Sequence, residues 1–125
     1  MVHFIGAGSG AADLITVRGQ NLLKSADIVI YAGSLVNEEL LSITKSDCKI
    51  YNSAYMTLEQ ITEIYIENRQ KEIVRLHTGD PCLYGAIKEQ MDILNENGIP
   101  YDICPGVSSF CGAAAALQME YTLPN

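Results

Sequence analysis

The sequence of 125 residues predicts an α/β domain in which five strands form a mainly parallel sheet flanked by helices. Short apolar runs alternate with stretches of helical spacing, and several of the runs end in glycine or other small residues. Hydrophobic residues make up 48% of the chain and charged residues 18%, as in a packed globular domain. Repeated strand, helix and strand units imply right-handed parallel crossovers. The expected strands are Val2–Ile5, Ile28–Tyr31, Lys49–Tyr51, Ile73–Leu76 and Tyr101–Cys104.

The helices expected in the first half follow from capping residues and apolar spacing. Thr16 is a suitable N-cap for a helix that carries Val17, Leu22 and Leu23. Residues 34–42 are expected to form a short helix. Thr57 and Gln60 have the spacing of a capping box, which opens a longer helix with a buried face of Ile61, Ile64 and Tyr65.

Two helices are expected in the second half. One runs from about Pro81 to Asn97, with Gly98 as its C′ residue and with Ala86, Met91 and Leu94 on its inner side. The other is rich in alanine, passes through Ala113 to Leu117, and has side chains small enough to pack close to the sheet.

The whole of 1–125 is expected to be one domain, because this length is enough for a single core.

The bulk composition excludes several classes of function. With 8 basic and 15 acidic residues the net charge is −7, which repels phosphate backbones and anionic lipid heads, so we expect no nucleic acid or membrane partner. The four cysteines form no CxxC pair, and no leader precedes the first strand, which favours reduced thiols in a cytoplasmic protein. The two histidines and these cysteines lack the spacing of a metal site, so no metal is expected.

A glycine-rich loop, Gly6 to Ala11, follows the first strand. It fits the G-x-G-x-x-G/A pattern of dinucleotide-binding domains, so a nicotinamide-dependent oxidoreductase is one candidate. That fold places an acidic residue near the end of the second strand, whereas Asp27 stands at the start of the strand here. The glycines are equally suited to a tight turn where two stretches of backbone pass closely.

Two further turns combine bare backbone with short polar side chains. Thr78-Gly79-Asp80-Pro81 follows the fourth strand, and Pro105-Gly106-Val107-Ser108-Ser109 follows the fifth. Ligands of open α/β sheets bind beyond the carboxyl ends of the strands, so these turns on neighbouring strands would face one crevice. Asp80 followed by Pro81 is also typical of an ordinary helix start, and Ser108 and Ser109 can each cap the alanine-rich helix.

Other polar residues near these turns are given structural roles. His77 lies in an apolar strand and is interpreted as a core histidine with satisfied hydrogen bonds. Tyr31 and Tyr84 are interpreted as half-buried core residues. Nothing around Cys82 marks it as a nucleophile, and none of these residues is assigned a catalytic role.

Several segments in fixed order resemble the tetrapyrrole methylases. They are Phe4–Gly10, Asp13–Thr16, Ala26–Val36, Arg75–Gly85 and Pro105–Phe110, and together the resemblance spans nearly all of the chain. The versions at Tyr31–Val36 and Gly85–Gln90 are most similar to the members that methylate corrin precursors in cobalamin biosynthesis. The resemblance implies the N-terminal domain of a two-domain, class III methyltransferase fold, with the second domain outside this chain.

The resemblance also implies a ligand, partners and site residues. The cofactor would be S-adenosyl-L-methionine and the substrate a corrinoid tetrapyrrole, in a protein expected to be a homodimer and inactive as an isolated domain. The implied cofactor-binding residues are Thr78, Gly79, Asp80, Leu83, Ser108 and Ser109. The substrate trough would include Gly8, Ser9, Gly10, Tyr31 and Ser34.

The first loop departs from the family pattern. Members usually carry GPGDP there, whereas this chain has Ser9 and Ala11-Ala12. The oxidoreductase domain remains an alternative, as does a ligand-binding module that has kept the fold without catalysis.

Overall fold

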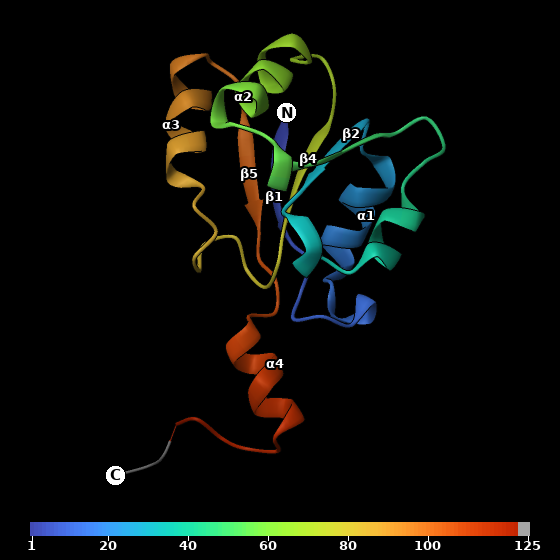
Figure 1. Ribbon diagram of the computed structural model, residues 1–125, viewed down its shortest axis with the longest axis vertical. Helices are drawn as coiled ribbons and strands as arrows, with labels where there is room; N and C mark the ends of the chain where they lie inside the picture. Colours follow the sequence, from blue (N-terminus) through green and yellow to red (C-terminus); the bar gives the residue numbers. More distant parts are fainter. Residues whose placement is uncertain (123–125) are drawn as a thin grey trace.

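The sheet is fully parallel and has the strand order β3-β2-β4-β1-β5 (Figure 1). A computed structural model describes residues 1–122. Its strands are β1 Val2–Gly6, β2 Ile28–Tyr31, β3 Lys49–Asn52, β4 Ile73–His77 and β5 Tyr101–Cys104. The five expected strands are therefore confirmed to within one residue at their ends, and so is the fold class.

Helices cover both faces of the sheet. The α-helices are α1 Val17–Ser25, α2 Leu58–Glu67, α3 Lys88–Glu96 and α4 Ser109–Ala116, and short 3-10 helices are formed by Ala12–Leu14, Gly33–Leu35, Glu38–Ile43 and Ser53–Tyr55. Figure 1 shows α2 and α3 on one side of the sheet and α1 on the other. Each face has its own core, one around Phe4, Ile30 and Tyr65 and the other around Ile5, Val29 and Leu76.

The capping predictions for the first two helices are confirmed. The Thr16 hydroxyl accepts a hydrogen bond from the Gly19 amide at 3.0 Å. Thr57 and Gln60 form a complete capping box at the start of α2. Residues 34–42, however, form two 3-10 segments separated by Val36 and Asn37 rather than one helix.

The prediction that β4 and β5 are neighbours is wrong. β1 lies between them and pairs in parallel with both. Local sequence patterns predict where strands lie in the chain, but they do not encode which strand lies between two others in the sheet. The turns after β4 and β5 nevertheless meet, because they converge across the end of β1.

The helix expected from Pro81 begins seven residues later, at Lys88. Residues 81–84 form a turn instead, and Tyr84 and Ala86 have φ angles of 59° and 53°, in the left-handed region. Such angles end a right-handed helix, and they place Ala86 on the surface rather than on the inner side of α3. Tyr84, expected to be half-buried, is 95% exposed.

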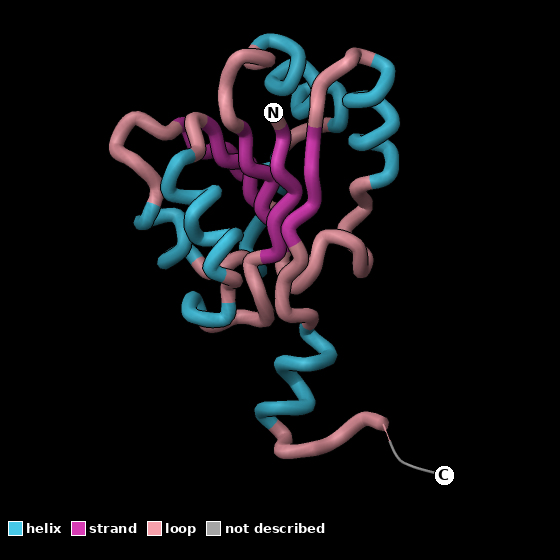
Figure 2. The backbone as a smooth tube through the Cα atoms, turned by 180° about the vertical axis from the view of Figure 1, so that it is seen from behind, coloured by secondary structure: helices cyan, strands magenta, loops and turns pink. Residues whose placement is uncertain are grey.

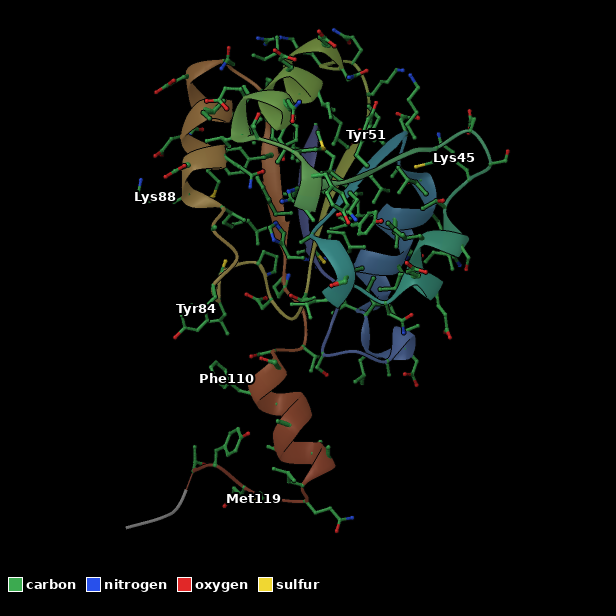
Figure 3. The ribbon with its side chains drawn as sticks, viewed as in Figure 1. Lys45, Tyr51, Tyr84, Lys88, Phe110 and Met119 are labelled. Carbon is green, nitrogen blue, oxygen red and sulfur yellow. The ribbon has the colours of Figure 1, made fainter. Side chains whose placement is uncertain are left out.

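The expectation that the alanine-rich helix packs on the sheet is also wrong. α4 extends away from the carboxyl end of the sheet, as Figures 1 and 2 show from opposite sides, and it has no buried residue. Its small apolar side chains are spread all around the helix, so no apolar stripe directs one face toward the domain. Figure 3 shows Phe110 and Met119 standing out from this region.

At the amino end of the sheet, His3 holds three strands together. Its Nδ1 lies 2.7 Å from an Asp102 carboxylate oxygen of β5, and its Nε2 lies 2.6 Å from Glu72, just before β4. The ring is buried, at 7% exposure. These contacts fix β4, β1 and β5 at the end opposite to the glycine turns.

Candidate functional site

Three glycines meet where β1, β4 and β5 end. A Cβ atom on Gly6 would lie 2.6 Å from the Gly106 Cα and closer still to the Gly79 carbonyl oxygen. A Cβ atom on Gly106 would meet the Gly79 oxygen and the Gly6 Cα in the same way. The three backbones approach this closely only because Gly6 and Gly106 have no side chain. Gly79 is required for another reason, its φ angle of 61°, since a Cβ atom there would meet only ordinary contacts of 3.5 Å or more. This junction brings the β4 and β5 turns together although β1 separates the strands.

The first glycine loop joins the same junction. Gly8 and Gly79 form an isolated antiparallel bridge, in which the Gly79 amide donates to the Gly8 carbonyl at 2.8 Å and the Gly8 amide donates back at 3.3 Å. Both residues have positive φ angles, 87° and 61°, which glycine adopts without steric cost. The loop after β1 is thereby attached to the turn after β4.

Asp80 connects the two turns through its carboxylate. One oxygen accepts a hydrogen bond from the Gly106 amide at 2.8 Å, and the other accepts from the Cys82 amide at 2.9 Å. The interpretation of Asp80 as the cap of a long helix is therefore wrong, because it caps only the short turn at 81–84. A carboxylate has about four acceptor positions, so capacity for a ligand remains.

These turns border a cleft of about 530 Å³ at the carboxyl end of the sheet. Its volume lies in the range typical of small-molecule sites. All six residues assigned to the cofactor line it, namely Thr78, Gly79, Asp80, Leu83, Ser108 and Ser109. Figure 3 shows Tyr84 and Phe110, which also line the cleft, at the end of the sheet from which α4 extends.

Only two of the five residues assigned to the substrate trough line the cleft. Gly8 and Ser9 line the cleft, whereas Gly10, Tyr31 and Ser34 are not among its lining residues. Gly10 is exposed, and its carbonyl accepts a hydrogen bond from the Asn37 side chain at 2.9 Å. Tyr31 is half-buried as expected, and Ser34 lies exposed in the 3-10 helix after β2.

Sequence reasoning missed several lining residues. They are Arg75 and His77 of β4, together with Ala32, Leu35, Tyr84, Gly85 and Phe110. The signal for the first two lay in strand alternation, because Arg75 and His77 share one face of β4. A charged residue between Val74 and Leu76 in a buried strand was the available clue.

His77 is buried, but it is not the satisfied core histidine that was expected. Its Nε2 atom is buried and has no hydrogen-bond partner among the described residues. Burial, reinforced by the positive charge of Arg75 and opposed by Asp80, lowers the pKa of His77 to about 3. The ring is consequently neutral near pH 7.

Arg75 is the buried cation of the cleft. Its Nη1 donates to the Ile30 carbonyl at 3.3 Å, and its Nε has no partner among the described residues. Burial lowers the pKa of Arg75 from its ordinary value, and the neighbouring Tyr65 opposes this shift. Burial raises the pKa of Tyr65, whose neutral hydroxyl donates to Gln90 at 2.6 Å.

The Ser108 side chain performs the capping role that was one of its two expected roles. Its hydroxyl accepts a hydrogen bond from the Phe110 amide at 3.2 Å at the start of α4. Ser109 follows as the first helical residue, and its amide nitrogen would lie 3.5 Å from a Cβ atom on Gly79. The start of α4 thus forms one wall of the cleft.

The glycine loop lacks two features of a dinucleotide site. In that fold the loop opens directly into a helix whose N-terminus holds the pyrophosphate. Here α1 begins only at Val17, after a 3-10 turn. Asp27 lies at the amino end of β2, where it pairs with Lys45 at 2.7 Å and accepts from the Glu72 amide at 2.9 Å. The oxidoreductase alternative is therefore not favoured.

Residues 1–122 contain no cluster of three His, Cys, Asp or Glu side chains suited to a metal ion. All four cysteines are free thiols. None of the helices in this part of the chain has both the length and the apolar character needed to cross a membrane.

Comparison with known proteins gives a consistent family. The sequence profile of the Tetrapyrrole (Corrin/Porphyrin) Methylases matches residues 1–125. The chain is 53% identical to the cobalt-precorrin-4 C(11)-methyltransferase of Methanocaldococcus jannaschii, over 99% of this chain and 49% of the relative. It is 47% identical to the precorrin-4 C(11)-methyltransferase of Pseudomonas aeruginosa, over 99% of this chain and 50% of the relative. The chain thus spans about half the length of these relatives.

Solved structures show the same architecture. The X-ray structure of a cobalamin biosynthetic enzyme, cobalt precorrin-4 methyltransferase, superposes with a TM-score of 0.94 and 45% identity, covering 98% of this chain and 52% of that one. A uroporphyrin-III C-methyltransferase of Thermus thermophilus in complex with S-adenosylhomocysteine superposes with a TM-score of 0.75 and 31% identity, covering 90% of this chain and 47% of that one.

Proposed function

The chain belongs to the tetrapyrrole (corrin/porphyrin) methylases, and from this premise we propose that it forms the S-adenosyl-L-methionine half of a corrinoid C-methyltransferase. The reaction would be methylation of precorrin-4 or cobalt-precorrin-4 at C11, as the names of its relatives indicate. A second domain would complete the site, since the chain covers about half of each relative. We propose that the complete protein is a homodimer.

The observation that supports this proposal most directly is the convergence of the Asp80 and Ser108 turns on one cleft. An adenosine-bearing amino acid offers hydroxyl, amine and carboxylate groups, which call for acceptors as well as donors. The Asp80 carboxylate and the Ser109 hydroxyl can accept hydrogen bonds from a ligand. Gly79 has no side chain, so a ligand can come close to its main chain. Leu83 and Phe110 supply apolar surface for the adenine ring.

The role of these residues is to orient a donor. A bound sulfonium cofactor supplies its own methyl group and leaving group, so the chain need not protonate or deprotonate the donor. Correct alignment of donor and acceptor can lower a barrier by several kcal/mol, up to roughly 10. We therefore propose that Thr78, Gly79, Asp80, Leu83, Ser108 and Ser109 position the cofactor, and that Gly8 and Ser9 border the tetrapyrrole.

A thermal-shift and calorimetry experiment tests cofactor binding. S-adenosylhomocysteine should raise the melting temperature, because a ligand that binds only the native state stabilises it, whereas NADH should not. Ser109→Trp would fill the cleft and abolish the response. Ser46→Trp, on an exposed turn that does not line the cleft, is the matched control. Stabilisation by NADH alone would contradict the proposal.

Methyl transfer is tested by complementation. The chain alone should produce no methylated corrinoid, and co-expression with the C-terminal half of the Methanocaldococcus jannaschii relative should restore the product. A ligand-binding module without catalysis would bind S-adenosylhomocysteine and fail in this assay. Mass spectrometry of the corrinoid product distinguishes the two.

A further inference from the structure

Arg75 lies at the floor of the cleft with most of its hydrogen-bonding capacity unused. The residue is 7% exposed, and it lines the cleft from the middle of β4. A guanidinium group has five N–H donors. Among the described residues, Nη1 donates to the Ile30 carbonyl at 3.3 Å, the guanidinium also lies beside the Tyr65 hydroxyl, and the Nε atom has no partner.

The positive charge of Arg75 also lacks a counter-ion. No carboxylate within residues 1–122 lies close enough to form a salt bridge with it. The Asp80 carboxylate is engaged by the amides of Gly106 and Cys82. Tyr65 and His77, the titratable groups beside the guanidinium, are uncharged near pH 7. Buried charges in proteins are normally paired, so the arrangement is incomplete without an anion.

We propose that Arg75 is the anchor for a carboxylate group of the bound ligand. A planar guanidinium can bind a carboxylate through two parallel hydrogen bonds, which fixes orientation as well as position. The chain carries a net charge of −7, so a local cation is needed where a polycarboxylate is held. The inference rests on the proposed function.

Two ligands of that function carry the required group. One is the methionine end of the cofactor, and the other is an acidic side chain of the tetrapyrrole. S-adenosylhomocysteine and 5′-methylthioadenosine distinguish the first source, because the second compound has the same nucleoside without the amino acid. Uroporphyrin III serves as the probe for the second source.

NMR of the arginine Nε–H groups provides a direct test on the unaltered protein. The chain has three arginines, and Arg18→Lys and Arg69→Lys, both at exposed positions, assign the signals by elimination. A shift of the Arg75 signal with S-adenosylhomocysteine but not with 5′-methylthioadenosine supports a cofactor carboxylate. A shift with uroporphyrin III alone supports a substrate carboxylate.

Two results would overturn the inference. If 5′-methylthioadenosine binds but neither carboxylate ligand moves the Arg75 signal, the anchor is refuted while the proposed cofactor cleft stands. If neither nucleoside binds in calorimetry, the proposed function fails and the inference fails with it.

Variants add a quantitative test. Arg75→Met should weaken the carboxylate ligand about 10- to 100-fold and leave 5′-methylthioadenosine unchanged, since charge-assisted hydrogen bonds are lost. Arg75→Lys keeps the charge and should restore part of the affinity. Equal weakening of all ligands by Arg75→Met would indicate a purely structural role and would count against the anchor.

Discussion

Gly106→Ala is expected to destabilise the protein strongly, although it adds a single methyl group. Its Cβ atom would lie 2.7 Å from the Gly6 Cα and 2.9 Å from the Gly6 carbonyl carbon, where ordinary contacts begin at 3.4 Å. The backbones must therefore separate by about 0.5 to 1 Å or more at the strand ends. Overpacking costs about 1 to 3 kcal/mol, and the upper end applies because backbone cannot rotate away as a side chain can.

The assay is urea and thermal unfolding of the wild type and the variant. A loss of about 3 kcal/mol corresponds to a melting temperature about 10 °C lower for a domain of this size. S-adenosylhomocysteine should also bind more weakly, because Gly79 and Ser108 on either side of the junction move apart.

Gly98→Ala is the matched control. Nothing lies within 4 Å of its Cβ position, and its φ of +65° makes the cost one of backbone strain alone, about 1 to 2 kcal/mol. It lies at the end of α3, outside the residues that line the cleft, so ligand affinity should not change. If Gly106→Ala costs no more than Gly98→Ala, the steric account of the junction is refuted.

Three further changes test other parts of the structure. Asp80→Ala removes two hydrogen bonds to main-chain amides and should cost about 2 to 3 kcal/mol in urea unfolding, whereas Asp92→Ala, in an exposed pair with Lys88, should cost less than about 1. The pKa of His77 is about 3 in the folded chain and about 6.5 in the unfolded chain, so only the unfolded chain takes up a proton between these pH values. Between about pH 8 and pH 5 the free energy of unfolding should therefore fall by about 2 kcal/mol more in the wild type than in His77→Phe. An equal pH dependence in both proteins would contradict the buried neutral ring. Thr57→Ala should cost about 1 kcal/mol in thermal unfolding by removing the α2 cap, and no change would exclude a contribution of the capping box.

The strands were predictable because each carries a short apolar run with local turn signals at its end. The start of α3 was not, since Asp80-Pro81 is typical of a helix start and nothing in the residue types of Tyr84 and Ala86 predicts left-handed backbone. α4 was misplaced for a different reason. Helical propensity is encoded locally, whereas its packing depends on an apolar stripe that this segment lacks.

The site was predictable as a set of turns but not as an arrangement in space. Gly79 and Asp80 could be found from turn chemistry, whereas Thr78 was implied only by the resemblance to the tetrapyrrole methylases. The hydrogen bond from the Gly106 amide to the Asp80 carboxylate joins turns that follow β5 and β4, with β1 between these strands. No local sequence pattern predicts this strand order. Arg75 was overlooked because a buried strand was interpreted as apolar throughout.

The sheet order explains why glycine is needed at both Gly6 and Gly106. With β1 between β4 and β5, two ligand turns can touch only by crossing over the end of the middle strand. That crossing requires Gly6 and Gly106 to have no side chain, because a Cβ atom on either would overlap backbone atoms of the junction, while Gly79 is required by its positive φ angle. His3 ties the same three strands through Glu72 and Asp102 at the far end, so their mutual positions are fixed at both ends. The turns that carry Asp80 and Gly106 are therefore positioned by the sheet itself, whereas Ser109 lies on α4, which has no buried residue.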